Sequence, residues 1–210
     1  HIKAEFAWGN FEDVITLVES LLSDNATFIN QNCSQTAIDL NTILCLDGMK
    51  IPFPRITYRD AIKELARGGF NHPFGKSLGS DEEQYLSKSF SSPFWVVSIP
   101  RSIEPFPYVV NPNDPETTLT ADLIANNGFG ELLGVAEKIS DLKMLEERMS
   151  EKNRLTDPRY QWLKELRSFG TVPHFGFGMG VERYLRWILN IPNVRDCIPF
   201  PRSFGRKIFP

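Results

Sequence analysis

Apolar residues recur at helical spacing in several stretches of the chain, and each such stretch predicts an amphipathic helix. In residues 11–22, phenylalanine, valine, isoleucine and leucine side chains fall on one face, and Ser23-Asp-Asn25 is expected to end that helix. The same pattern predicts further helices over residues 36–46, from the N-cap Thr57 to Gly68-Gly69, and within residues 158–170.

Runs of β-branched and aromatic residues predict strands between these helices. Phe94-Trp-Val-Val-Ser-Ile-Pro100 has the continuous apolar character of a central strand, and residues 119–124 and 128–138 read as two further strands. In residues 102–111, Pro107 withdraws a backbone donor, so this segment should lie at a sheet edge or be interrupted.

The stretch from Gly176 to Arg183 carries the strongest functional signal. Glycines at 176, 178 and 180 strip one face of an extended segment, so a flat ligand can lie against backbone. From Gly180 onward apolar residues return at helical spacing, which places Arg183 in the first turn, above the bare face. The alternative is a strand with glycines for close packing and an incidental Glu-Arg pair. The spacing is neither that of the dinucleotide fingerprint nor that of the phosphate-binding loop.

Composition narrows the class of protein. With 210 residues, 41% of them hydrophobic, the chain can bury a sizeable core and is expected to form one domain, residues 1–210. A net charge of −3 argues against a broad nucleic-acid-binding surface. No apolar run reaches the ~20 residues of a membrane span and no signal peptide opens the chain, so we expect a cytoplasmic protein without a membrane partner. Cys33, Cys45 and Cys197 lack the spacing of a disulfide framework or a zinc site, and are interpreted as buried or idle thiols.

Two neighbouring motifs carry a family resemblance. Thr171-Val-Pro-His-Phe-Gly-Phe-Gly-Met-Gly-Val-Glu-Arg183, followed by Asn193-Val-Arg-Asp-Cys-Ile-Pro-Phe-Pro-Arg202, resembles the third signature motif of class II aminoacyl-tRNA synthetases, in particular the asparaginyl and aspartyl subgroup. The resemblance implies an α+β fold, with an antiparallel sheet flanked by helices, in a homodimer. It also implies ATP-dependent activation of aspartate or asparagine as an aminoacyl adenylate, with tRNA as a further candidate partner.

The resemblance assigns the nucleotide site residue by residue. Gly176, Gly178 and Gly180 would form the floor under ATP, and Arg183 and Glu131 are the candidate catalytic residues in contact with it. Glu131 is also the candidate ligand of Mg²⁺, since small flanking residues leave its carboxylate uncrowded and Mg²⁺ prefers oxygen ligands. Asp122 matches an acidic residue upstream and is the second candidate metal ligand; a hydrogen bond at a strand end is the equal alternative for it.

Three residues are assigned to the amino-acid pocket by the same resemblance, and here the chain departs from the family. Arg167 and Glu83 fall on family residues, whereas Lys138 stands where the family has arginine and therefore lacks the planar fork that grips a carboxylate. Ile139 replaces a glutamate typical of asparaginyl enzymes. A pocket that lost an acceptor but kept positive charge should favour aspartate over asparagine. The alternative for Arg167 is a solvent-facing helix arginine.

The resemblance begins in the middle of the family pattern. Residues 2–10 resemble the segment directly after the second motif, so the sequence as given lacks the first and second motifs and any anticodon-binding domain. Three functions therefore stay open: asparaginyl-tRNA ligation, an asparagine-synthetase-like reaction in which ammonia captures an aspartyl adenylate, and a non-catalytic paralogue that keeps the fold in a binding or regulatory role.

Overall fold

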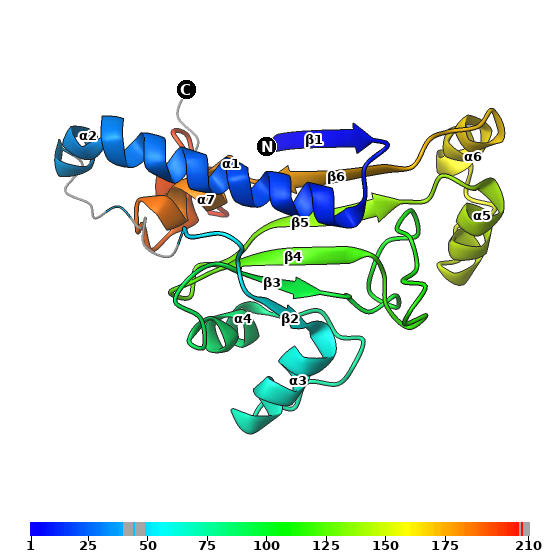
Figure 1. Ribbon diagram of the computed structural model, residues 1–210, viewed down its shortest axis with the longest axis horizontal. Helices are drawn as coiled ribbons and strands as arrows, with labels where there is room; N and C mark the ends of the chain where they lie inside the picture. Colours follow the sequence, from blue (N-terminus) through cyan, green and yellow to red (C-terminus); the bar gives the residue numbers. More distant parts are fainter. Residues whose placement is uncertain (40–43, 45–48, 206, 208–210) are drawn as a thin grey trace.

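A computed structural model describes residues 1–39, 44, 49–205 and 207 as one six-stranded sheet with helices around it (Figure 1). In chain order the elements are β1 (Ile2–Ala7), α1 (Phe11–Asn32), α2 (Ser34–Asp39), β2 (Arg55–Thr57), α3 (Tyr58–Arg67), α4 (Ser80–Ser87), β3 (Phe94–Val97), β4 (Thr120–Ala125), β5 (Gly130–Lys138), α5 (Leu142–Glu151), η1 (Pro158–Tyr160), α6 (Gln161–Ser168), β6 (His174–Met179), α7 (Val181–Ile188) and η2 (Val194–Cys197).

The strand order is β1-β6-β5-β4-β3-β2, and every neighbouring pair is antiparallel except β2 and β3, which run parallel. The predicted α+β class, with an antiparallel sheet flanked by helices, is therefore confirmed. The apolar run at residues 94–97 is an internal strand, as predicted, because β3 pairs with β2 on one side and β4 on the other.

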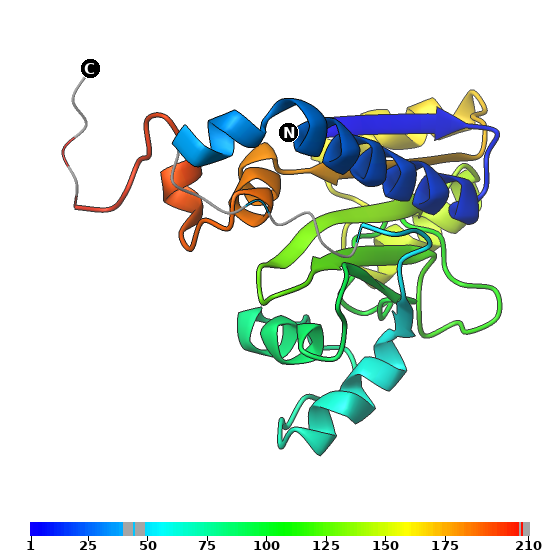
Figure 2. The same ribbon diagram turned by 60° about the vertical axis from the view of Figure 1, so that its left-hand side comes forward.

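The two faces of the sheet are covered unequally. Successive side chains of a strand point to opposite faces. Ala121, Leu123 and Ala125 of β4 pack with α1 in the largest apolar cluster, whereas Ile124 joins Phe94 in a second cluster beneath α3 and α4. Figures 1 and 2 show α1 lying over β6 and β5, and α3 and α4 at the opposite edge of the sheet, near β2 and β3. The second face is thus covered over β2 and β3 and where α4 contacts β4 and β5, and the rest of this face is left to other residues.

The first long helix differs from its prediction. We expected it to end at Ser23-Asp-Asn25, but α1 continues to Asn32. Polar residues of its middle bond within the helix: the amide Nδ2 of Asn25 donates to the carbonyl of Leu21 at 2.8 Å. Ala26 is buried against the sheet, so tertiary packing overrides the local stop signal.

Other predictions on helices and loops are mostly confirmed. Thr57 is the N-cap of α3, and its hydroxyl accepts from the backbone N–H of Asp60. The segment 102–111 is interrupted, with only isolated bridges at Tyr108 and Val110. The second predicted helix is described at Ser34–Asp39, and the remainder of residues 36–46 lies almost wholly outside the described residues.

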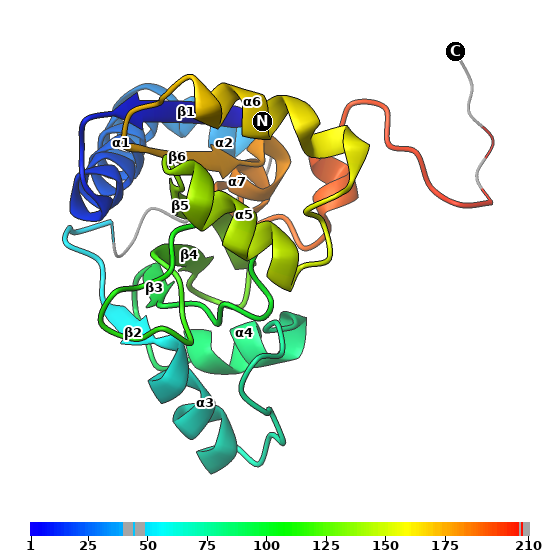
Figure 3. The same cartoon turned by 90° about the vertical axis from the view of Figure 1, so that its right-hand side faces the viewer.

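The end of the sheet formed by β5 and β6 is closed by α5 and α6, which lie side by side (Figure 3). Cys33 and Cys197 are free and partly exposed rather than buried, and Cys45 lies outside the described residues. Within the part of the chain that the structure describes, no helix has the length and apolar character to cross a membrane.

A buried carboxylate joins α1 to the sheet. The Oε1 atom of Glu19, which is 4% exposed, accepts from the indole Nε1–H of Trp95 at 2.9 Å and from the backbone N–H of Phe53 at 3.2 Å. Buried donors without an acceptor are destabilising. Glu19 therefore couples the helix layer to β3 and to the segment before β2.

We expect Glu19→Ala to lower the free energy of unfolding by about 2–4 kcal/mol, because it leaves two buried donors unpaired. Glu19→Gln keeps an oxygen acceptor and should lose less. Thr16→Ala, at an exposed position of α1, is the control. Urea unfolding of the three variants checks this; equal stability of Glu19→Ala and Thr16→Ala would show that the bonds to Trp95 and Phe53 contribute nothing.

Candidate functional site

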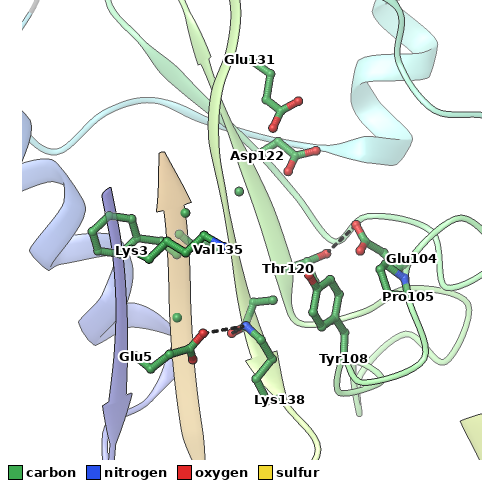
Figure 4. Close-up of a pocket in the computed structure, with 15 residues that line it drawn as sticks. Lys3, Glu5, Glu104, Pro105, Tyr108, Thr120, Asp122, Glu131, Val135 and Lys138 are labelled. Carbon is green, nitrogen blue, oxygen red and sulfur yellow. Dashed lines mark hydrogen bonds and ion pairs between the residues drawn. The ribbon is translucent and has the colours of Figure 1, made fainter. Parts of the chain in front are cut away.

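A cavity of about 460 Å³ lies on the uncovered part of the sheet (Figure 4). Four strands and the loop after β3 contribute to it, and charged side chains predominate among the larger residues. The residues that line it are Lys3, Glu5, Glu104, Pro105, Tyr108, Thr120, Asp122, Glu131, Gly134, Val135, Ala136, Lys138, Gly176, Phe177 and Gly178.

The floor of the cavity is bare backbone, as predicted for the glycine face. Gly176 and Gly178 of β6 lie opposite Glu5 and Lys3 of β1 in the strand register. A Cβ at Gly176 would lie 2.3 Å from the carboxylate carbon of Glu5, so this position has no room for a side chain while Glu5 keeps its place. At Gly178 the nearest atom to such a Cβ belongs to the side chain of Lys3, 3.7 Å away, which is an ordinary van der Waals distance.

A β-bulge brings Glu131 into the cavity. Along β5, Leu133 pairs with Leu123 but the next pair joins Glu131 to Ile124, so one residue is skipped. Leu132 and Leu133 consequently both pack in the core beneath α1. Bulges re-aim side chains in this way. Without the extra residue, strict alternation would put Glu131 on the core face.

Arg183 and Glu131 meet at one end of the cavity. The Nη1 atom of Arg183 donates to the backbone carbonyl of Glu131 at 2.8 Å and lies 3.1 Å from its carboxylate. Three adjoining cavities of about 410, 230 and 430 Å³ also have Glu131 in their lining, and two of them include Arg183. The structure therefore brings the predicted pair together at the junction of a branched groove, with Gly180 and Gly178 on its floor.

Carboxylates crowd this junction. Burial and the neighbouring charge of Glu131 raise the pKa of Asp122 well above its usual range, and burial raises the pKa of Glu104 to about 7. Burial also raises the pKa of Glu83, whose Oε2 accepts from the backbone N–H of Glu131 at 3.0 Å. A cation would relieve this repulsion.

The carboxylates at this junction can supply only part of the coordination shell of Mg²⁺. Among the described residues no group of three or more His, Cys, Asp or Glu side chains is arranged to enclose a metal. Mg²⁺ commonly takes one or two carboxylates and completes its shell with phosphates and water. Asp122 and Glu131 would supply those carboxylates from adjacent strands, since Glu131 pairs with Ile124, two residues along β4 from Asp122.

Lys138 marks the opposite end of the cavity, together with Glu5 (Figure 4). Its Nζ atom lies 3.9 Å from a carboxylate oxygen of Glu5 and 5.1 Å from the ring centre of Tyr108, and donates to the carbonyl of Ala136 at 3.2 Å. Burial lowers the pKa of Lys138. This end of the cavity thus offers a donor and an acceptor side by side.

Arg167 is not among the residues that line the described cavities. It is 8% exposed; its Nε donates to the carbonyl of Ile139 at 2.7 Å, and its Nη2 lies 3.3 Å from Nε2 of His174. The guanidinium supports the backbone next to Lys138, and a direct contact with the amino acid stays a prediction. Because Arg167 is buried, the alternative of a solvent-facing helix arginine is wrong. Glu83 borders the side cavities rather than the main one.

The sequence patterns did not indicate Glu5, Glu104 and Tyr108 as cavity residues. Their positions depend on pairings across the sheet: Glu5 lies opposite Gly176, and Tyr108 bridges to Lys138. The alternation of charged and apolar residues at the start of the chain was a usable signal for Glu5. Ile139 is buried with Phe106 beneath α5, away from the cavity.

The comparisons with known proteins all indicate one family, the class II tRNA synthetases. A family model for class II tRNA synthetases (D, K and N) matches residues 1–204. Asparagine--tRNA ligase of Pyrococcus furiosus is 36% identical in an alignment of 211 positions that covers 98% of this chain and 48% of that protein. Asparaginyl-tRNA synthetase from Pyrococcus horikoshii, complexed with asparaginyl-adenylate, has a TM-score of 0.90 at 35% identity, covering 98% of this chain and 48% of the other.

A more distant structure shares the fold as well. Aspartyl tRNA synthetase from Entamoeba histolytica has a TM-score of 0.86 at 25% identity and covers 98% of this chain and 43% of its own. The chain thus spans about half the length of the relatives it matches.

The raised pKa of Glu104, about 7, predicts a pH-dependent stability. Between pH about 4.3 and about 7 the folded state keeps a proton that the unfolded state has released, so this group makes stability fall as pH rises. Glu104→Gln should match the parent at pH 4 and exceed it at pH 8 by on the order of 1–3 kcal/mol.

Urea unfolding between pH 4 and pH 8 measures this difference, with Glu147→Gln at an exposed position as the control. A gap between Glu104→Gln and the parent that does not change with pH would contradict the assignment.

Proposed function

The chain belongs to the class II tRNA synthetases (D, K and N), and from this premise we propose that it activates an amino acid with ATP, in the manner of an asparaginyl-tRNA synthetase. The observation that carries the proposal is the continuous floor between Lys138 and Arg183. Lys138 and Glu5 lie at one end of this floor, and Arg183 lies at the other end with the carboxylates of Asp122 and Glu131. The backbone of the glycine strand lies between them.

In the proposed reaction, an amino acid at the Lys138 end of the cavity reacts with ATP bound at the Arg183 end. A carboxylate oxygen of the amino acid attacks the α-phosphorus of ATP, a carbon–oxygen–phosphorus linkage forms, and pyrophosphate leaves. Such a centre is activated by positioning and positive charge rather than by a protein nucleophile. Arg183 would meet phosphate oxygens at the junction, and Asp122 and Glu131 would hold Mg²⁺, which neutralises phosphate charge. Gly176, Gly178 and Gly180 would allow the nucleotide to lie against the sheet.

Asparagine is the amino acid that the far end of the cavity favours. Its side-chain carbonyl can accept from Lys138 while its amide NH₂ donates to Glu5, which are 3.9 Å apart at their nearest charged atoms. The expected preference for aspartate rested on Ile139 having removed an acceptor from the pocket. Ile139 is instead buried in the cluster under α5, and Glu5 supplies a carboxylate beside the lysine. The Pyrococcus horikoshii relative is complexed with asparaginyl-adenylate, which agrees with this proposal.

The wider parts of the proposal rest on family membership alone. They comprise residues 1–210 as one catalytic domain, tRNA as the acceptor, a homodimer and a cytoplasmic location. Transfer to tRNA distinguishes the ligase from an asparagine-synthetase-like reaction. If supplied ammonia, rather than tRNA, consumed the adenylate, the acceptor in this proposal would be wrong while the activation step would stand.

Arg183→Ala should weaken ATP binding in the presence of Mg²⁺ by about 2 kcal/mol, as expected for a lost charge-assisted contact. Arg154→Ala, which removes an exposed arginine outside the groove, is the matched control. Calorimetric titration with ATP compares the two variants. Equal affinities would remove Arg183 from the nucleotide site.

Amino-acid-dependent exchange of pyrophosphate into ATP tests the activation step and its specificity. We expect exchange with asparagine to exceed exchange with aspartate, and Glu5→Gln to shrink that ratio by about tenfold, because the variant no longer repels a second carboxylate and offers the asparagine amide a weaker acceptor. Glu12→Gln, at an exposed site on α1, is the control. A preference for aspartate in the parent protein, or an unchanged ratio in Glu5→Gln, would overturn the role of Glu5.

A further inference from the structure

A second cavity, of about 580 Å³, lies between α5 and the loop that follows β3. This loop contributes Glu104 to the first cavity and Arg101 and Ser102 to the second. From α5 and the residue after it come Arg148 and Lys152. Three cationic side chains therefore converge on a space that the proposed activation reaction does not use. Figure 3 shows α5 at this end of the sheet.

The carboxylates of this cavity do not balance its cations. Glu151 is shared, since it forms ion pairs with both Arg101 and Arg148. Glu116, the other acidic residue of the lining, lies 2.6 Å from the guanidinium of Arg59, which comes from α3. Within the lining of this cavity, one shared carboxylate is thus left to three cations; the carboxyl of Glu104, which also interacts with Lys152 and Arg148, lines the first cavity.

Arg148 carries the clearest sign of a missing anion. It is 2% exposed; its Nη1 pairs with Glu151 and its Nη2 donates to the carbonyl of Arg101 at 3.2 Å, but its Nε has no partner among the described residues. A buried guanidinium N–H without an acceptor is destabilising. Burial lowers the pKa of Arg148 to about 10, and repulsion from the neighbouring Arg101 contributes to this shift.

Lys152 adds a further donor at the same place. Its Nζ atom donates to the carbonyl of Ser102, and an ammonium has three protons to give. Burial lowers its pKa, and repulsion from Arg148 lowers it further. An anion between the two side chains would remove this repulsion and satisfy the unused protons.

We propose that this second cavity binds a phosphate group, held by Arg148, Lys152 and Arg101. Phosphate accepts several charge-assisted hydrogen bonds at once and suits the planar fork of arginine together with the point charge of lysine. The cavity is larger than a bare phosphate ion and has the ring of Phe74 in its lining, so a phosphate that carries a further group fits. Its source is either a small phosphorylated molecule or the backbone of an RNA, and the chemistry recognised is the same.

Two variants of the full chain test the site, because they should change the affinity for phosphate in opposite directions. Lys152→Gln should weaken binding of inorganic phosphate about tenfold, since a charge-assisted bond is lost. Glu151→Gln should instead strengthen it by a few fold, because the competing internal carboxylate is neutralised. Lys143→Gln and Glu147→Gln make the same charge changes at exposed positions of α5 outside the cavity and should leave the affinity within about twofold of the parent.

Calorimetry with inorganic phosphate, adenosine 5′-monophosphate and a short single-stranded RNA measures these affinities. A loss in Lys152→Gln that Lys143→Gln does not share supports the site, and the probe that binds most tightly identifies the source. Equal losses of affinity in Lys152→Gln and Lys143→Gln would show that only the net charge matters, and would overturn the proposal. So would phosphate binding that Arg183→Ala abolishes and Lys152→Gln leaves unchanged, because it would belong to the first cavity. This outcome is independent of whether the chain activates an amino acid.

Discussion

The architecture of this chain follows from a sheet with too few helices to cover both faces. On one face α1 buries the apolar residues of four strands, and on the other α3 and α4 cover β2, β3 and only those parts of β4 and β5 that α4 contacts. Exposed apolar residues on the remaining area would favour aggregation. The chain instead puts glycines, threonine and charged residues there, so the open face is stable in water and is also the surface on which polar ligands can lie.

Crowded charge is the energetic consequence of that open face. Burial and mutual repulsion raise the pKa values of Asp122, Glu104 and Glu83, so the ionised cluster destabilises the free protein. Arg183 compensates only in part, because it is half exposed and its partner Glu131 is screened by solvent. Such an arrangement is typical of sites that bind a cation or a cationic complex, where stability is sacrificed for function.

Local patterns in the sequence predicted the parts of the site that are contiguous in the chain. The glycine strand, the helix after it and the place of Arg183 all follow from spacing within eight residues, and the structure contains them as predicted. Contacts between distant segments were beyond such patterns. The register that sets Glu5 opposite Gly176 and the bulge that turns Glu131 toward the cavity are properties of strand pairs. Arg167 illustrates the same limit, since its place in the chain matched a family residue but its guanidinium contacts the carbonyl of Ile139, just after β5, and His174.

The loop between β3 and β4 gives the two cavities a common wall. Arg101 and Ser102 face the second cavity, whereas Glu104 and Tyr108 face the first. Charged groups on the two sides of this loop interact. Lys152 and Arg148 lower the pKa of Glu104, whereas burial raises it by more. Electrostatic interactions of this kind act over several ångströms when the intervening space is protein rather than water. A phosphate bound to those two cations would cancel their field, and Glu104 would then hold its proton more firmly. With phosphate bound as proposed, ligands in the two cavities would be coupled through the carboxyl group of Glu104, although they touch different elements of the fold.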